Sequence, residues 1–101
     1  MQSQKITDEK AADIAIKMSE TERNVIMHCW KEKSWRYPRI AELIGASYSD
    51  VQDVGHKLQK MRLAYVSVVH YNGSAIFLNE DGEIVKRAVE LLEKIRVSRS
   101  V

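Results

Sequence analysis

The sequence of 101 residues contains one cysteine, one proline, one phenylalanine and four glycines. A single cysteine excludes an internal disulfide framework and fits the reducing cytoplasm, which is the expected location. No apolar run approaches the roughly 18 residues that span a bilayer, so no membrane partner is expected. The first residues lead into a charged segment and not into the apolar stretch of a signal peptide.

The sequence also has little that suggests catalysis or metal binding. His28 and Cys29 are adjacent, and neighbours on a helix do not face one another, so they do not form a nucleophile–base pair. The three histidines, His28, His56 and His70, fall in different predicted elements and lack the spacing of metal ligands. Cys29 lies on an apolar stripe and is interpreted as a core residue in preference to a redox sensor. We expect no enzymatic activity, no catalytic residue, no metal and no cofactor.

The composition is that of one soluble domain. Hydrophobic residues make up 45% of the chain and charged residues 30%, which is ordinary for a globular protein. The length suits a single domain that buries its own core and gains further stability from dimerisation. A formal net charge of +2 says little about a nucleic-acid partner, so the distribution of the basic groups has to decide. No internal repeat or linker divides the chain.

Two helices are predicted in the first third of the sequence. Thr7 is the expected N-cap of the first, whose apolar stripe comprises Ala11, Ile14, Ala15 and Met18. Ser19 and Glu22 match a capping box, which opens a second helix predicted to run to about Lys33. The following segment cannot cover the first stripe alone. We therefore expect the first helix to pack on the last helix or on a second subunit.

A short helix, a tight turn and a longer helix are predicted between residues 37 and 62. Pro38 fits the first turn of the short helix, and Gly45 is placed to end it in the left-handed conformation. Ser47 is the expected N-cap of the longer helix, whose apolar stripe is formed by Val51, Val54, Leu58 and Met61. The opposite face carries Tyr48, Ser49, Gln52, Asp53, His56 and Lys60. This order is the helix-turn-helix pattern.

The periodicity changes after the second of these helices. Residues 63–71 are rich in Val and Tyr and predict a strand, Asn72 and Gly73 predict a type I′ turn, and residues 74–78 form the return strand. Asn79 or Asp81 can cap the last helix. That helix carries two apolar stripes, one of Ile84, Ala88, Leu91 and Ile95 and one of Val85, Val89 and Leu92. Because one small domain cannot cover both, one stripe is expected to meet a partner.

This order of elements resembles the winged helix-turn-helix domain of prokaryotic transcriptional regulators, closest in style to the MarR-like and related small repressors. The resemblance covers residues 19 to about 87 and is carried by residues 37–47 (YPRIAELIGAS), the helix after them, and the hairpin that runs into residues 78–82 (LNEDG). It implies an α+β, mostly helical fold in a single domain. Residues 1–18 would form an N-terminal helix, 19–81 the helix-turn-helix and wing, and 82–101 a C-terminal dimerisation helix.

In such families the second helix of the motif enters the major groove, the wing touches flanking backbone or minor groove, and the outer helices form a dimer. The resemblance therefore implies a homodimeric transcriptional regulator that binds double-stranded DNA sequence-specifically. The residues expected to read bases are Tyr48, Ser49, Gln52, Asp53 and His56. Those expected to bind phosphates are Lys33, Arg36, Tyr37, Arg39, Lys57, Lys60, His70 and Asn72. Those expected at the dimer interface are Ile14, Met18, Ile84, Ala88, Leu91, Leu92 and Ile95.

Three features depart from the family pattern. Gly55 lies in the middle of the expected recognition helix, at a cost of about 1 kcal/mol against Ala. Asp50 and Asp53 place negative charge where family members often carry Arg or Lys, and the wing at 70–74 lacks arginine. An alternative therefore stays open, a winged-helix module that binds a protein partner without specific DNA binding. The position of the basic groups of residues 31–39 relative to the polar helix face distinguishes the two.

Overall fold

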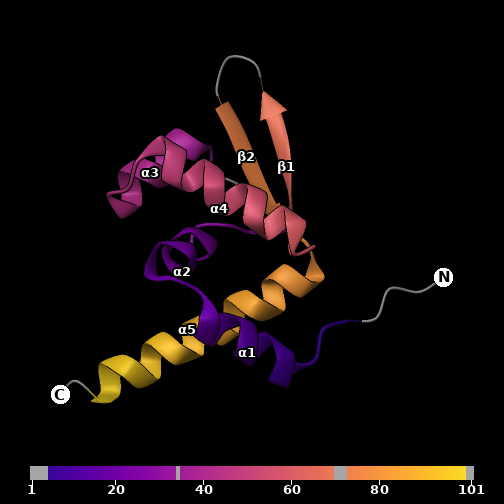
Figure 1. The fold of residues 1–101 in the computed structure, drawn as a ribbon, viewed down its shortest axis with the longest axis vertical. Helices are drawn as coiled ribbons and strands as arrows, with labels where there is room; N and C mark the ends of the chain where they lie inside the picture. The colour runs from indigo at the N-terminus through magenta and orange to yellow at the C-terminus, as the bar shows by residue number, and fades with distance from the viewer. Residues whose placement is uncertain (1–4, 34, 70–72, 100–101) are drawn as a thin grey trace.

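The computed structural model describes residues 5–33, 35–69 and 73–99 of the chain. In this part of the chain the elements are α1 (Asp8–Lys17), α2 (Glu20–Ile26), α3 (Tyr37–Ile44), α4 (Tyr48–Lys60), β1 (Ala64–Val69), β2 (Gly73–Leu78) and α5 (Glu80–Arg99). The hairpin stands at one end of the molecule beside α3 and α4, while α1 and α5 cross at the opposite end (Figure 1). The predicted α+β, mostly helical winged helix-turn-helix is confirmed.

The predicted helix starts agree with the structure. The side chains of Thr7, Ser19 and Ser47 each accept a hydrogen bond from the backbone N–H three residues later. Glu22 completes the capping box, because its Oε1 accepts from the Ser19 N–H at 2.9 Å. Gly45 ends α3 with φ of 69°, a left-handed conformation that glycine adopts without steric cost. The three side-chain caps fix where α1, α2 and α4 begin, and Gly45 fixes where the tight turn after α3 lies.

The second helix is shorter than predicted. It ends at Ile26, not near Lys33, and Trp30 instead forms an isolated parallel bridge with Phe77. The Trp30 carbonyl accepts from the Leu78 N–H at 2.9 Å. The helix was predicted too long because this backbone pairing is tertiary and leaves no mark on the local apolar pattern.

The two strands pair antiparallel, with Tyr65 opposite Phe77 and Val69 opposite Gly73. Gly73 is therefore the first residue of β2, and the predicted turn centred on Asn72 and Gly73 is misplaced. The connecting residues 70–72, with the predicted contacts His70 and Asn72, lie outside the described residues.

Asn79 caps α5, which decides between the two predicted caps. Its Oδ1 accepts from the Gly82 N–H at 2.8 Å, and its Nδ2 donates to the Arg62 carbonyl at 2.7 Å. Arg62 itself has a φ of 62°, an unusual left-handed conformation for a residue with a side chain. Asn79 therefore ties the end of the wing to the end of α4 as well as starting α5.

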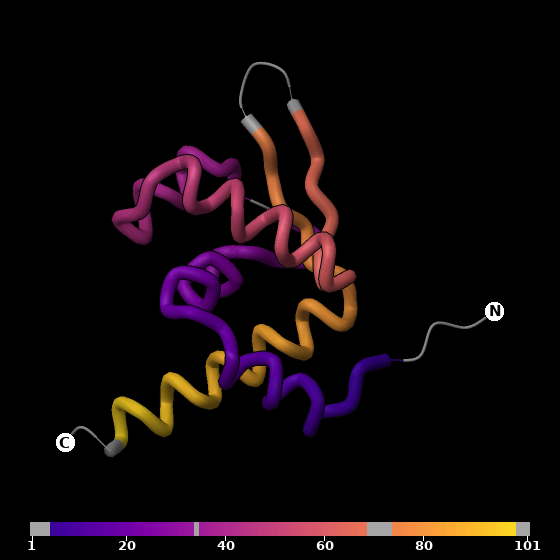
Figure 2. The backbone as a smooth tube through the Cα atoms, viewed as in Figure 1, coloured from indigo at the N-terminus to yellow at the C-terminus, as the bar shows by residue number. Residues whose placement is uncertain are grey.

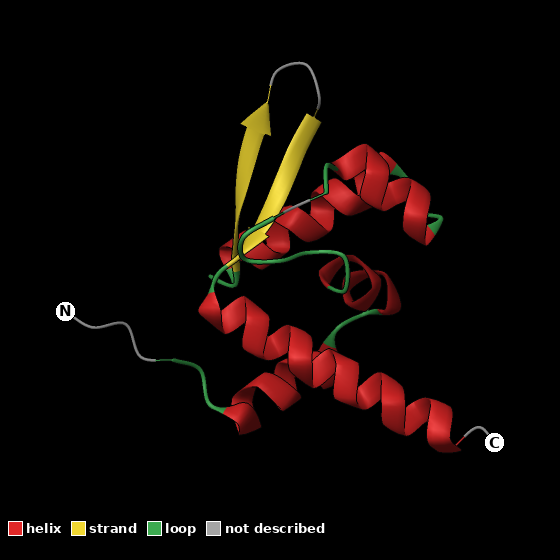
Figure 3. Ribbon diagram, turned by 180° about the vertical axis from the view of Figure 1, so that it is seen from behind, coloured by secondary structure: helices red, strands yellow, loops and turns green. Residues whose placement is uncertain are grey.

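The apolar stripe of α1 packs on α5 within the chain, one of the two expected solutions. Ala11, Ala15 and Met18 are buried together with Val85 and Val89 of α5. The crossing of the two helices is visible from both sides (Figures 2 and 3). No helix within the described ranges is long and apolar enough to cross a membrane.

Candidate nucleic-acid interface

The helix α4 presents a polar face to solvent above an apolar stripe. Val51, Val54 and Leu58 are buried, while Ser49, Gln52, Asp53 and His56 are exposed. Met61 was predicted to extend the stripe, but it follows the end of the helix and is 37% exposed. The polar face therefore carries both hydrogen-bond donors and hydrogen-bond acceptors. They are held on a rigid helix and are accessible to a partner.

Tyr37 does not lie on this surface. Its side chain is 1% exposed and packs beneath α4, where its hydroxyl meets no hydrogen-bond partner among the described residues. Burial, with smaller contributions from Tyr48 and Cys29, raises the pKa of Tyr37 to about 12. The predicted phosphate contact of Tyr37 is therefore wrong. Tyr37 is the first residue of α3 and belongs to the inward face of that helix.

Gly55 explains how α4 accommodates this ring. A Cβ built at residue 55 would overlap the Tyr37 hydroxyl and lie 3.0 Å from its Cζ atom. The glycine that departs from the family pattern therefore serves the packing of α3 against α4. A side chain at this position would separate the two helices of the motif.

Tyr48 packs against the Tyr37 ring from the solvent side of that ring. Its aromatic ring meets Tyr37 edge-on, with centroids 5.7 Å apart and planes at 69°, and its side chain stays 41% exposed. This is a favourable geometry for an aromatic pair. Tyr48 is thus held in a defined orientation at the N-terminal end of α4, next to Ser49.

Two predicted phosphate-binding arginines lie at the start of α3, Arg36 just before the helix and Arg39 within it. Arg36 precedes α3 and pairs with Ala75 of β2 in an antiparallel bridge. Arg39 bonds to Glu42 at 2.7 Å, and its guanidinium lies 5.8 Å from the centroid of the exposed Trp35 ring. Arg36 therefore lies where the motif meets the wing, while Arg39 contacts residues of α3 and of the segment before it.

Two predicted phosphate-binding lysines are engaged elsewhere. The Lys57 ammonium lies 2.6 Å from Glu22 of α2, and the Lys33 ammonium lies 4.7 Å from the centroid of the Trp30 ring. Lys60 is exposed on α4, and no ion pair of it is seen within the described part of the chain. Lys60 is therefore more available to a phosphate than Lys57 or Lys33, whose ammonium groups already contact other side chains.

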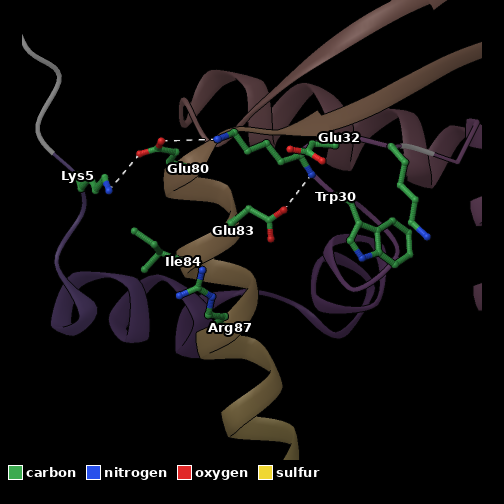
Figure 4. A pocket seen from close by; sticks show the side chains of 9 residues that line it. Lys5, Trp30, Glu32, Glu80, Glu83, Ile84 and Arg87 are labelled. Atoms are coloured by element: carbon green, nitrogen blue, oxygen red, sulfur yellow. Dashed lines mark hydrogen bonds and ion pairs between the residues drawn. The ribbon is translucent and has the colours of Figure 1, made fainter.

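A polar hollow of about 860 Å³ lies on the other side of the molecule, between the segment after α2 and the start of α5 (Figure 4). Glu80 pairs there with Lys5 at 3.4 Å and Lys31 at 3.6 Å, and the Lys31 N–H donates to Glu83 at 2.9 Å. The charges of Lys5 and Lys31 hold the pKa of Glu80 below its usual value. These carboxylates serve to tie the N-terminal segment and the loop to α5.

Cys29 is confirmed as a core residue. It is 0% exposed, and burial raises the pKa of its thiol to about 12.

Lys86 of α5 is a buried cation next to Cys29, and the apolar pattern of α5 did not predict its burial. Its ammonium donates to the Cys29 carbonyl at 2.9 Å and lies 4.1 Å from the centroid of the Trp30 ring. Burial lowers the pKa of Lys86 from its ordinary value.

The predicted dimer residues divide into three groups by their exposure. Met18 is 6% exposed in the core of its own chain, so its assignment to an interface is wrong. The partly buried residues Ile14, Ile84, Ala88 and Leu92 pack against the same core. Leu91 and Ile95 are 60% and 52% exposed on α5. The C-terminal end of α5 projects beyond the other elements (Figures 1 and 3).

The arrangement is that of a winged helix-turn-helix domain, and solved structures share it. YusO of Bacillus subtilis is similar with a TM-score of 0.69 and 16% identity, over 93% of this chain and 70% of that one. MepR of Staphylococcus aureus, a transcription regulator of the multidrug efflux pump MepA, gives 0.63 and 13%, over 92% and 73%. The complex of MepR with DNA gives 0.60 and 15%, over 91% and 77%.

No protein-family model matches the sequence, and no curated protein matches it. At these identities the structural similarity shows the fold. The expected resemblance to winged-helix regulators of the MarR-like kind is confirmed at that level.

Proposed function

We propose that this protein is a transcription regulator of the cytoplasm that binds double-stranded DNA sequence-specifically as a homodimer. The observation that carries the proposal is the exposed polar face of α4, anchored from below by Val51, Val54 and Leu58. A rigid helix with exposed donors and acceptors suits the major groove, which presents a distinct hydrogen-bonding pattern for each base pair. The fold is shared with MepR, which has been crystallised with DNA.

Base reading is assigned to the exposed face of α4 from its N-terminus as far as His56, because this end of a recognition helix points into the groove. The amide of Gln52 can pair bidentately with adenine, and the carboxylate of Asp53 can accept from the N4 amino group of cytosine. Tyr48, Ser49 and His56 complete the proposed reading set. Asp53 therefore contributes to sequence specificity in this proposal, although its negative charge opposes nonspecific attraction to the DNA phosphates.

Phosphate binding is assigned to the basic side chains around this face, Arg36, Arg39 and Lys60. His70 and Asn72 complete the proposed set, and Lys33 is left out because its ammonium lies over the Trp30 ring and its side chain lines the polar hollow beside α5. The wing itself adds no formal charge, because residues 63–79 contain no Asp, Glu, Lys or Arg. The electrostatic part of the affinity then comes from α3, α4 and the segment before them.

The proposed dimer uses the exposed stripe of α5. Leu91 and Ile95 are large apolar side chains exposed on α5, a helix whose C-terminal end extends past the other elements (Figure 1). A two-fold axis through this stripe would bury them against their copies, as an isologous interface requires. It would also present two α4 helices to one DNA duplex.

Selection of bound duplexes from a random pool tests the proposal. The expected result is enrichment of an inverted repeat whose half-sites lie about one helical turn, ~34 Å, apart. No enrichment, with binding that vanishes at physiological salt, would overturn it.

The uncharged wing favours a second candidate function, a module that docks on a protein. Tyr65 and Val68 of β1 are 55% and 71% exposed, and Tyr65 stacks on Phe77 with centroids 5.2 Å apart. Apolar side chains on an uncharged hairpin suit a protein surface better than a phosphate backbone. A failed duplex selection would leave this candidate as the favoured one.

A further inference from the structure

Two polar side chains hold α4 from opposite flanks, outside its apolar stripe. On one flank Gln59 Oε1 accepts from the Val66 N–H of β1 at 2.9 Å. On the other flank the Lys57 ammonium lies 2.6 Å from Glu22 Oε2 of α2. With 3.6 residues per turn, Lys57 and Gln59 point about 160° apart around the helix axis. The Lys57 contact therefore resists a rotation of α4 that would move this flank away from α2, and the Gln59 contact resists a rotation that would move the other flank away from β1.

The Lys57 flank lacks full apolar support. An apolar hollow of about 110 Å³ lies between α1, α2 and α4, lined by Ile14, Met18, Glu22, Val54, Lys57, Leu58 and Met61 among others. Close packing is what fixes the position of a helix, and on this flank a hollow partly open to solvent interrupts it. On this flank the ion pair of Lys57 with Glu22 spans the gap that packing leaves.

Glu22 is a fixed anchor for this contact. Its side chain is 13% exposed, and its second oxygen is already engaged by the Ser19 N–H in the capping box of α2. The carboxylate therefore cannot follow the lysine outward. A lysine bound to a carboxylate that is itself held sets a definite distance between α4 and α2.

We propose that Lys57 and Gln59 are positioning residues that fix the rotation of α4 and so aim its reading face at the bases. This inference rests on the proposed DNA-binding function, and it gives Lys57 this task in place of a phosphate contact. Side chains extend about 5–6 Å from the helix axis, so a rotation of about 20° moves their tips by about 2 Å. A shift of that size breaks a bidentate contact to a base.

Lys57→Met and Gln59→Leu test the proposal, with Lys60→Met as the matched control. Affinity is measured over a range of salt for a duplex selected by the wild type and for a random-sequence duplex of equal length. We expect both test variants to lose about 3- to 30-fold of the preference for the selected duplex, with an unchanged salt slope. Lys60→Met is expected to weaken both duplexes alike and lower the slope by about 0.9. Lys57→Arg, which can still pair with Glu22, is expected to restore the preference.

Both side chains lie outside the core, and thermal unfolding of each variant is measured to check that it is folded at the assay temperature. A salt slope that falls as far in Lys57→Met as in Lys60→Met would make Lys57 a phosphate contact and overturn the inference. Unchanged preference in both test variants would overturn it as well. If the wild type selects no duplex, the proposed function fails first, and this inference falls with it.

Discussion

The hydroxyl of Tyr37 occupies the space that a Cβ on Gly55 would need. The two residues belong to the two helices of the motif, α3 and α4, and their contact brings these helices close together. Glycine in a helix costs about 1 kcal/mol against alanine, so α4 accepts a local loss in exchange for this packing. The hydroxyl has no hydrogen-bond partner among the described residues. The contact therefore contributes close packing and no hydrogen bond.

Gly55→Ala is expected to destabilise the protein, although alanine is the better helix former. Overlap with the Tyr37 ring forces the helices apart, and overpacking of this kind costs about 1–3 kcal/mol. Urea unfolding measures the free energy of unfolding. In the double variant with Tyr37→Phe the hydroxyl is gone, and most of the loss is expected to be recovered. A single variant as stable as the wild type would show that α3 and α4 do not meet through these residues.

Gln52→Ala is expected to remove the preference for one base position of each half-site while nonspecific binding persists. A bidentate pair discriminates against the wrong base by about 1–3 kcal/mol, which sets the expected loss. Competition binding with duplexes that differ at single positions measures it. Asn24→Ala removes an exposed amide from α2 and serves as the control. Equal losses for every duplex would assign Gln52 to the backbone.

Arg39→Ala is expected to weaken binding to all duplexes by a similar factor. If its guanidinium neutralises one phosphate, the slope of log affinity against log salt falls by about 0.9. Binding titrations at several salt concentrations measure this slope. Lys10→Ala removes an equal charge from α1 and is expected to leave the slope unchanged. A slope unaffected by Arg39→Ala would exclude Arg39 from the interface.

Glu22→Gln is expected to flatten the acid side of the stability profile. Burial alone would raise the pKa of Glu22, but hydrogen bonds from Lys57 and Ser19 and the lysine charge lower it below the ordinary 4.5. The unfolded chain then binds more protons at acid pH, so this contribution is present above pH 4.5 and is lost as the pH falls through the folded-state pKa. Urea unfolding between about pH 3 and 6 compares the variant with the wild type. Parallel profiles would contradict the ion pair.

Leu91→Asp is expected to convert the proposed dimer to monomers, because a charge would be buried against its two-fold copy. Sedimentation velocity at micromolar concentration measures the change. Leu43→Asp places the same charge on an exposed site of α3, away from α5, and is expected to leave the dimer intact. A wild type that sediments as a monomer would refute the interface itself.

The sequence by itself determined the features whose partners lie within one turn of the chain. The caps at Thr7, Ser19 and Ser47 and the left-handed end at Gly45 follow from residues three or four positions apart. Apolar periodicity likewise showed which face of α4 is buried, and with the hairpin it was enough to predict a winged helix-turn-helix.

Tertiary structure decided the contacts between residues far apart in the chain. Trp30 lies outside α2, and its carbonyl accepts a hydrogen bond from Leu78 of β2. Tyr37 is buried because Gly55 has no side chain and leaves space for its ring. Lys57 is directed to Glu22 because α2 lies against that flank of α4. A local pattern gives the type and spacing of side chains but not the element that packs on each face. For that reason the exposed polar face of α4 was predictable from sequence, and the side chains of other elements that contact α4 were not.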